Sequence, residues 1–146
     1  MPSYTAPLAD YRFILNDVLN IQAYADLPGF ADATPDTVDA ILEGAAQLAE
    51  EVLQPINHSG DQEGCTRNAD GSVTTPKGFK EAYRLFVEGG WGALTSDPDY
   101  GGQGLPNVLG SCFSEMVSAA NMAFVMYPGL SHGAYSAIHV HGSQAQ

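Results

Sequence analysis

The chain has 146 residues, a length typical of one domain, and 45% of them are hydrophobic. Its 17 acidic and 5 basic side chains give a formal net charge of −12. That balance excludes nucleic-acid binding, because phosphate contacts need clustered Lys and Arg. No apolar run reaches the roughly 18 residues of a membrane-spanning helix, and Met1–Leu19 lacks the basic start and apolar centre of a signal peptide. We therefore expect a cytoplasmic chain.

The charge is distributed unevenly along the chain. Residues 116–146 contain no Asp, Glu, Lys or Arg. A terminal segment of a free-standing small domain normally carries a solvated charged face, so this segment indicates burial against further protein or against a ligand cavity. The last residues, 142–146, resemble a helix end followed by the opening of another element. We interpret the chain as a fragment of a longer protein.

Two helices are predicted in the first third of the chain. Over residues 10–24 apolar side chains recur at three- and four-residue steps, which predicts an amphipathic helix that ends at Leu27–Gly29. Its apolar stripe is Phe13, Ile14, Val18, Ile21 and Ala25. Thr34 is placed to cap a second helix with Pro35 at its first position, and Pro55 marks its expected end. The stripe of this second helix is Val38, Ile41, Leu42, Ala45, Leu48, Ala49, Val52 and Leu53.

A long loop and a third helix follow. Residues 57–75 are rich in Gly, Asp, Asn, Ser and Thr, which predicts a loop with a turn at Asn68–Gly71 that leads into a short extended piece. The pair Thr75 and Pro76 predicts the start of the third helix, and Gly89–Gly90 predicts its end. The face of this helix is formed by Phe79, Ala82, Tyr83, Phe86 and Val87.

The remaining residues predict a second loop and two more helices. The loop covers residues 91–104, the fourth helix runs from about Pro106 to Ala120, and the fifth runs from Met122 or Pro128 to His141. No segment alternates apolar and polar residues over a useful length, as a half-buried strand would. The predicted fold class is all-α, a helical bundle of about five to six helices.

The residues that carry chemistry elsewhere do not form a recognisable site here. Tyr100–Gly104 is rich in glycine, but a dinucleotide fingerprint needs a preceding strand and a different spacing. His132 and His139 can share a helical face, yet this region offers no carboxylate as a third metal ligand. Ser131 and His132 are helical neighbours that point in different directions, with no acid beside them to orient the imidazole. We predict no catalytic residue and no metal site in the chain.

The two cysteines, Cys65 and Cys112, follow no metal or redox spacing. Two cysteines are also too few to staple a secreted scaffold. We expect both to be reduced and structural.

Three sequence segments together resemble the amino-terminal helical domain of acyl-CoA dehydrogenases. They are Trp91–Leu94, Asp97–Leu105 and Phe113–Met116, in that order and at the spacing of the family. Asp97 and Asp99 stand where many members have Glu. The end of the chain, His141–Gln146, resembles the start of the stretch that enters the middle β-domain of the family. The resemblance thus covers residues 34–146 and implies a helical domain that is truncated before the β-domain.

The resemblance implies a flavin-dependent parent enzyme that converts an acyl-CoA thioester to a trans-2-enoyl-CoA. Members bind FAD mainly through the middle β-domain and the carboxy-terminal helical domain, which also carries the glutamate base. This chain is therefore expected to be inactive alone and to hold no FAD tightly. The resemblance assigns it a wall of the acyl pocket, with Val125, Met126 and Leu130 as the substrate-binding residues. It also implies electron-transfer flavoprotein as a partner and a homo-oligomeric parent.

Residues 11–30 further resemble the amino-terminal extension of a bacterial subgroup that includes 3-methylmercaptopropionyl-CoA dehydrogenases. This divides the chain into an extension over residues 1–33 and the helical domain over residues 34–146. A second hypothesis stays open beside that of an enzyme domain. The chain can instead be an acidic helical protein-interaction module whose uncharged tail docks a protein partner.

Overall fold

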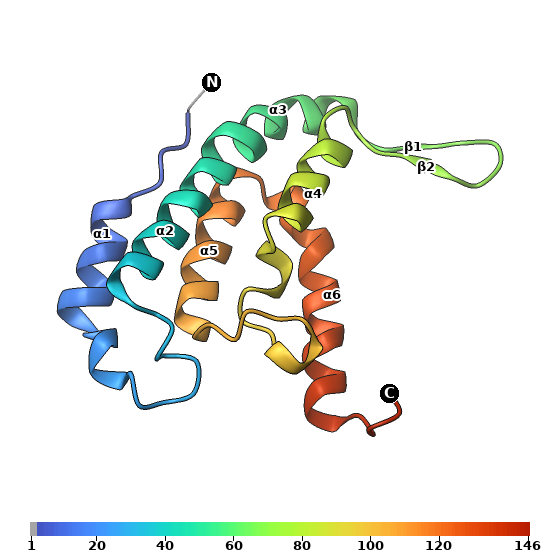
Figure 1. The fold of residues 1–146 in the computed structure, drawn as a ribbon. Coiled ribbons are helices and arrows are strands. Elements are labelled where there is room, and N and C mark those ends of the chain that lie inside the picture. Colours follow the sequence, from blue (N-terminus) through green and yellow to red (C-terminus); the bar gives the residue numbers. More distant parts are fainter. Residues whose placement is uncertain (1–2) are drawn as a thin grey trace.

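The computed structural model describes residues 3–146, which form six α-helices, several short helical turns and one small hairpin. In Figure 1, α1, α2 and α5 lie side by side, and contacts continue from α5 to α6. The prediction of an all-α bundle is confirmed. No helix within the described residues has the length and apolar character that a bilayer crossing needs. The helices are α1 (Leu8–Arg12), α2 (Pro35–Gln47), α3 (Gln54–Glu63), α4 (Phe79–Glu88), α5 (Asn107–Ala120) and α6 (Met122–His141).

The amino-terminal helix differs from the prediction in its buried face. Helix α1 continues into a π-helical turn over Phe13–Val18, and Asn20 then takes a left-handed conformation with φ 46° that ends the run. Tyr11 and Leu15, four positions apart on one helical face, are buried instead. The predicted stripe is wrong at four positions, which are exposed: Phe13, Ile14, Val18 and Ala25.

The second predicted helix begins where the sequence indicated. The side chain of Thr34 accepts a hydrogen bond from the backbone N–H of Thr37 at 3.2 Å, and Pro35 occupies the first helical position. Pro35 has no N–H to leave unsatisfied there, and its φ suits a helix start. The N-cap prediction is confirmed.

The predicted end of that helix at Pro55 is wrong. Helix α2, a π-helical turn over Leu48–Leu53 and α3 follow one another without a break, and Figure 1 shows them as one long helical run. The π-helical turn widens the helix just before Pro55, a residue that has no N–H to donate to the preceding turn. The run ends only at Gly64, where φ is 65°, so residues 57–63 are helical and the loop begins later than expected.

A hairpin and α4 follow Gly64. Strand β1 (Thr66–Arg67) pairs antiparallel with β2 (Val73–Thr74), and Figure 1 shows this hairpin reaching away from the helices. The predicted turn is confirmed, since the backbone N–H of Asn68 donates to the carbonyl oxygen of Ser72 at 2.8 Å. Helix α4 (Phe79–Glu88) starts after Gly78, so its first residue is three positions later than Pro76.

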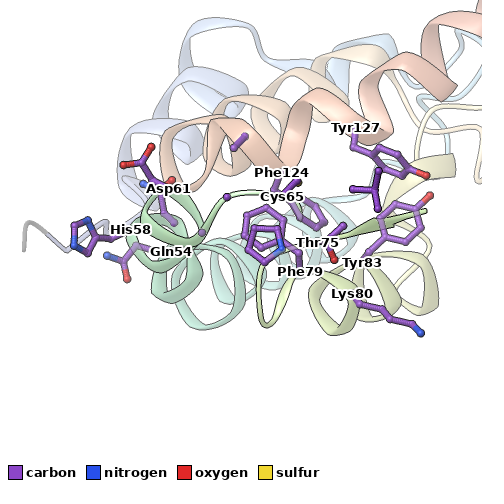
Figure 2. Close-up of a pocket in the computed structure, with 16 residues that line it drawn as sticks. Gln54, His58, Asp61, Cys65, Thr75, Phe79, Lys80, Tyr83, Phe124 and Tyr127 are labelled. Carbon is purple, nitrogen blue, oxygen red and sulfur yellow. The ribbon is translucent and has the colours of Figure 1, made fainter. Parts of the chain in front are cut away.

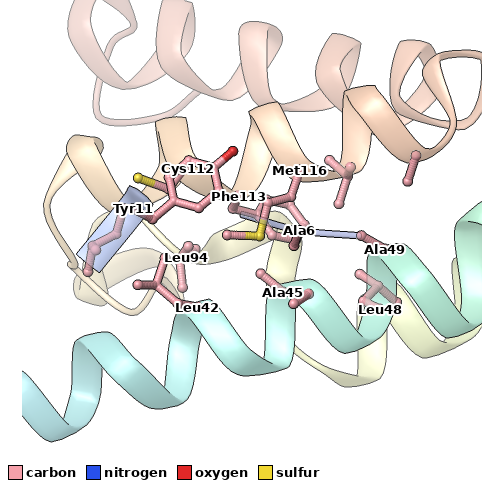
Figure 3. Close-up of a cluster of buried hydrophobic side chains, with 14 of the residues drawn as sticks. Ala6, Tyr11, Leu42, Ala45, Leu48, Ala49, Leu94, Cys112, Phe113 and Met116 are labelled. Atoms are coloured by element: carbon pink, nitrogen blue, oxygen red, sulfur yellow. The ribbon is translucent and has the colours of Figure 1, made fainter. Parts of the chain in front are cut away.

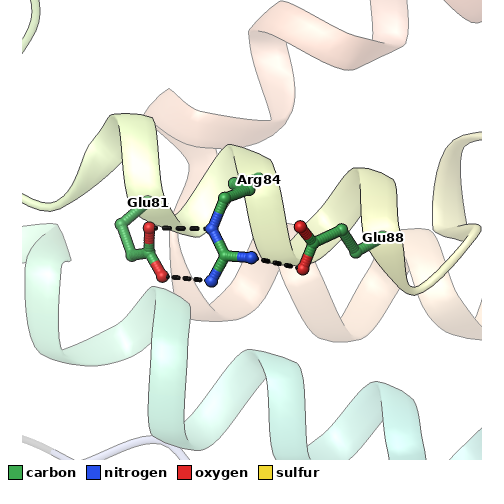
Figure 4. Close-up of polar contacts among 3 residues, drawn as sticks. All are labelled: Glu81, Arg84 and Glu88. Carbon is green, nitrogen blue, oxygen red and sulfur yellow. Dashed lines mark hydrogen bonds and ion pairs between the residues drawn. The ribbon is translucent and has the colours of Figure 1, made fainter.

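The end of α4 is confirmed at Gly89–Gly90, where Gly90 has φ 72°. On its solvent side Arg84 lies between two carboxylates, as Figure 4 shows. Its Nη2 is 2.6 Å from Glu81 Oε1, and its Nη1 contacts Glu88. These hydrogen bonds, the one to Glu81 first, raise the pKa of Arg84 above its ordinary value. All three side chains are more than half exposed, so the cluster orders a surface and adds little to stability.

The main hydrophobic core lies between α2 and α5. Figure 3 shows Leu42 and Ala45 of α2 facing Phe113 and Met116 of α5, and all four are buried. The first 33 residues contribute to the same cluster, so the predicted extension packs directly on the helical domain. Their buried members are Ala6, Tyr11, Leu15, Ile21 and Ala33.

One buried polar side chain fixes the junction between α5 and α6. Asn121 is fully buried, and its Nδ2 donates to the carbonyl oxygen of Leu53 at 3.1 Å. Its Oδ1 accepts a hydrogen bond from the backbone N–H of Phe124 at 3.1 Å and so caps α6. The first turn of α6 is thereby attached to the long α2–α3 run.

Candidate functional site

A cavity of about 390 Å³ lies between α5, α6 and the short helical turn over Trp91–Ala93. We call it the α5–α6 cavity. Helix α5 lines it with small polar residues, among them Ser111 and Ser114, and α6 lines it over positions 124–132. Its volume falls at the lower end of the range of small-molecule sites in proteins.

The walls of this cavity are mainly aromatic and apolar. Trp91 and Phe113 stack at a centroid distance of 4.9 Å with an interplanar angle of 2°, and Phe86 packs against Phe113 at 6.1 Å. His132 is the one titratable side chain among the residues described as lining it. An apolar cavity with a few hydroxyl groups suits the end of an acyl chain and does not suit an anion.

Three glycines line the α5–α6 cavity, and they differ in what surrounds them. A Cβ added at Gly92 would lie 3.2 Å from Phe86 Cε1. A Cβ added at Gly110 of α5 would lie 2.8 Å from Thr95 Cγ2, so close packing explains that glycine. A Cβ added at Gly129 of α6 would meet nothing within 4 Å. Because glycine inside a helix costs about 0.5 to 1 kcal/mol relative to Ala, Gly129 has no packing benefit to offset that cost. Its lack of a side chain leaves open room beside the cavity.

The three predicted substrate-binding residues do not all lie at this cavity. Val125 is half-buried and lines the α5–α6 cavity. Met126 is 63% exposed and Leu130 is 73% exposed, and both lie on the opposite side of α6 from the buried Phe124. We call this surface the outer face of α6, defined by Met122, Met126, Leu130 and Val140. The assignment of substrate contact to Val125, Met126 and Leu130 remains a prediction.

A larger cavity of about 1110 Å³ lies between α3, the hairpin, α4 and the start of α6. Its floor is aromatic, with Phe79 and Phe124 at 6.3 Å and Tyr83 and Tyr127 at 5.3 Å between ring centroids. Figure 2 shows His58 and Lys80 pointing away from this floor. Residues 3–146 contain no group of three or more side chains that is placed to hold a metal ion.

Both cysteines are free thiols within this fold. Cys112 is buried on α5, as expected for a structural residue, and burial followed by the nearby Glu115 carboxylate raises its pKa. Cys65 is exposed and lines the larger cavity, so the expectation of a structural role is wrong for it.

The structure brings an acid to one of the α6 histidines, which the sequence did not indicate. His139 Nε2 lies 2.9 Å from Asp97 Oδ2, a carboxylate that comes from the loop before α5 and not from the region of the histidines themselves. The hydrogen bond from the backbone N–H of Asp99, and then the one to His139, hold the pKa of Asp97 below its ordinary value. Asp97 and His139 are 42 positions apart, so no local spacing signals the pair.

Comparison with known proteins decides the family. The model of the acyl-CoA dehydrogenase amino-terminal domain matches residues 35–146. The chain belongs to the acyl-CoA dehydrogenase family. It is 35% identical, over 99% of its length, to a 3-methylmercaptopropionyl-CoA dehydrogenase of Ruegeria pomeroyi. It is 33% identical, over 97% of its length, to a butyryl-CoA dehydrogenase of Syntrophomonas wolfei.

These relatives are much longer than the chain. It spans 24% of the Ruegeria protein and 24% of the Syntrophomonas protein. It also spans 21% of a broad-specificity linear acyl-CoA dehydrogenase of Mycobacterium tuberculosis, to which it is 28% identical. The resemblance to acyl-CoA dehydrogenases that the sequence motifs indicated is confirmed. The resemblance to the bacterial subgroup is confirmed as well, since the Ruegeria relative is a 3-methylmercaptopropionyl-CoA dehydrogenase.

Proposed function

We propose that this chain forms a wall of the acyl pocket in a flavin-dependent acyl-CoA dehydrogenase, which removes the α and β hydrogens of an acyl-CoA thioester and yields a trans-2-enoyl-CoA. The observation that carries the proposal is the α5–α6 cavity, whose walls are mainly aromatic and apolar and which Gly129 lines without a side chain. Each methylene of an acyl chain that enters such a cavity contributes about 0.8 kcal/mol of transfer free energy. The domain thus contributes to binding and selection, and the chemical step takes place on groups outside it.

The residues that line the α5–α6 cavity do not fit a flavin dinucleotide. A pyrophosphate is bound by backbone N–H groups at a helix N-terminus or by Arg and Lys. Among the residues described as lining the α5–α6 cavity there is no Arg or Lys. The glycine-rich loop at Tyr100–Gly104 follows a short helical turn and not a strand, which is not the setting of a dinucleotide fingerprint. We expect the flavin ligands of the parent enzyme to come from other parts of the protein.

For the same reason we expect the 146-residue chain to show no acyl-CoA dehydrogenase activity by itself. The measurement is dye reduction with acyl-CoA after gel filtration, together with the visible absorbance of the eluted protein. A yellow peak that keeps its flavin absorbance through the column contradicts this expectation.

Met126 and Leu130 fit the proposal where further protein covers the outer face of α6. In that arrangement the acyl chain passes between α6 and the covering part and contacts Met126 and Leu130, whereas Val125 contacts an acyl chain only where it enters the α5–α6 cavity. In the complete dehydrogenase, Met126→Ala is expected to shift preference toward longer or bulkier acyl groups by roughly tenfold or more in kcat/KM. The widened pocket accounts for the shift, because one methylene is worth about 1 to 3 kcal/mol of discrimination.

Val140→Ala is the matched control for this test, since Val140 is similarly exposed, at 69%, but lies 14 residues or about 21 Å further along α6 than Met126 and is not one of the predicted substrate-binding residues. It should leave the acyl-length profile unchanged. An unchanged profile for Met126→Ala together with a lower Tm assigns Met126 to packing and contradicts the pocket role.

The outer face of α6 also favours a second function, an acidic helical module that docks a protein partner. Its four members are each at least 56% exposed and carry no charge. The two functions differ in what the parent binds. Acyl-CoA turnover by the complete protein supports the first, whereas partner binding without turnover supports the second. Electron-transfer flavoprotein as electron acceptor, a homo-oligomeric state and a cytoplasmic location remain predictions.

A further inference from the structure

The second half of α6 has few apolar contacts with the rest of the fold. Phe124 is the buried residue of this helix, and the apolar side chains Leu130, Ile138 and Val140 are 73%, 50% and 69% exposed. Pro128 lies inside the helix and removes one hydrogen bond from its backbone ladder. Packing alone therefore gives little to hold the segment after Pro128 in one place.

A polar junction attaches this segment to the loop that precedes α5. The backbone N–H of Asp97 donates to Tyr135 Oη at 2.8 Å, and the Asp97 carboxylate contacts His139 Nε2 at 2.9 Å. The other carboxylate oxygen of Asp97 accepts from the backbone N–H of Asp99 at 2.9 Å. One residue of the loop is thus tied to two residues of α6 that lie four positions apart on one helical face.

Ring contacts add to the same junction. Tyr135 stacks on His139 with a centroid distance of 5.4 Å and an angle of 28°. Tyr100 meets His139 edge-on at 5.8 Å. The loop is closely packed on itself, because a Cβ on Gly102 would lie 2.0 Å from the backbone oxygen of Ser96, and the backbone N–H of Gly104 donates to that oxygen at 2.9 Å. The junction therefore joins a helix with little apolar packing to a closely packed loop.

We propose that Asp97, Tyr135 and His139 act as positioning residues that set where α6 lies against α5, and thereby the width of the α5–α6 cavity. The inference rests on the proposed function of that cavity. Helix α6 is fixed at its start by Asn121 and near its end by the junction, about 27 Å further along at 1.5 Å per residue. The cavity-lining residues 125–132 lie between these two anchors, on either side of Pro128. None of the three positioning residues is among those described as lining the α5–α6 cavity.

The first test is amide hydrogen exchange of the 146-residue chain over residues 129–141. Tyr135→Phe keeps the ring and removes the oxygen that accepts from Asp97, while His139→Ala removes the contact with the carboxylate. Each variant is expected to raise exchange in this segment by about tenfold, the effect of losing one hydrogen bond of ordinary strength. Exchange over α5 should stay unchanged. His141→Ala is the matched control, because His141 lies in the same last turn and outside the junction.

The second test uses the complete dehydrogenase and asks whether the junction affects the cavity. His139→Ala should change the ratio of kcat/KM between a short and a long acyl-CoA by about fivefold or more, mainly through KM, with His141→Ala again as control. A ratio that stays within twofold overturns the inference even where α6 exchanges faster. Exchange that stays within twofold for both Tyr135→Phe and His139→Ala also overturns it. Failure of the proposed function is a separate result, recognised by a wild-type enzyme that does not turn over acyl-CoA.

Discussion

Replacing Gly129 by Ala is expected to stabilise the chain. The added Cβ meets nothing within 4 Å, and Gly129 lies in the interior of α6 with an ordinary helical backbone. The substitution removes conformational freedom from the unfolded chain and adds no clash to the folded one. We expect the free energy of unfolding to rise by about 0.5 to 1 kcal/mol and Tm to rise by about 2 to 4 °C.

Urea unfolding followed by circular dichroism measures this change, and the m-value should stay the same. Gly60→Ala is the matched control in α3. There a Cβ would lie 2.5 Å from Phe79 Cε2, so the control should destabilise the chain by about 1 to 3 kcal/mol through overpacking. A loss of stability for Gly129→Ala refutes the reasoning, because it shows that the space beside Gly129 is not open.

The same position links stability to the proposed pocket. A glycine that lowers helix stability without a packing benefit is expected where a ligand needs the room. In the complete dehydrogenase, Gly129→Leu should therefore lower kcat/KM for long acyl groups by about tenfold or more while short ones are spared. Equal losses for all acyl lengths would instead indicate a distorted α6.

Four further predictions concern the chain itself. Asn121→Ala removes the cap of α6 and leaves the Leu53 carbonyl oxygen without its partner, so urea unfolding should show a loss of about 2 to 4 kcal/mol. A maleimide should label one thiol per folded chain, the exposed Cys65, and reach the buried Cys112 only in urea. Arg84→Ala should leave Tm nearly unchanged at physiological salt despite its two carboxylate partners, because the cluster is exposed. The outer face of α6 should cause concentration-dependent self-association in sedimentation experiments, which Met126→Asp suppresses.

Local signals in the sequence were sufficient to predict several elements. Thr34 followed by Pro35 marks the start of α2 by a side-chain cap, and Gly89–Gly90 marks the end of α4 by a left-handed turn. Helix α5 was predicted within one residue of its bounds, and α6 agrees with the longer of its two predicted ranges. In each case the structure depends on side chains close to one another in the sequence, which is why the pattern is informative.

Other features depend on contacts that no local pattern records. The helix continues through Pro55 because a π-helical turn precedes it, and such a turn has no sequence signature. Near the amino terminus, Phe13 and Ile14 fit a helical stripe, yet Tyr11 and Leu15 are the side chains buried in the core. Register at that helix is set by its tertiary neighbours and not by periodicity.

The candidate site also combines residues that the sequence predicted with residues that only the folded chain reveals. Val125 was reached through the family resemblance, and it does line the α5–α6 cavity. Gly129 was not singled out, although a glycine inside an otherwise apolar helix is a signal that points to a packing or functional reason. The contact of Asp97 with His139 joins a loop to a helix across 42 positions, and only the folded chain brings the two together.

Helix α6 therefore has two surfaces, and variants on each surface test a different part of the proposal. Val125 and Gly129 border a cavity whose walls all belong to this chain, so their variants act on a space that already exists in it. Met126 and Leu130 lie on the outer face, which becomes part of a pocket only where further protein covers it. Because residues 116–146 carry no charge, both surfaces of α6 are suited to exclude water once they are covered. If variants of Val125 and Gly129 change acyl selection and variants of Met126 and Leu130 do not, the pocket lies wholly within the α5–α6 cavity. Effects from both pairs would instead show that both surfaces of α6 affect acyl selection.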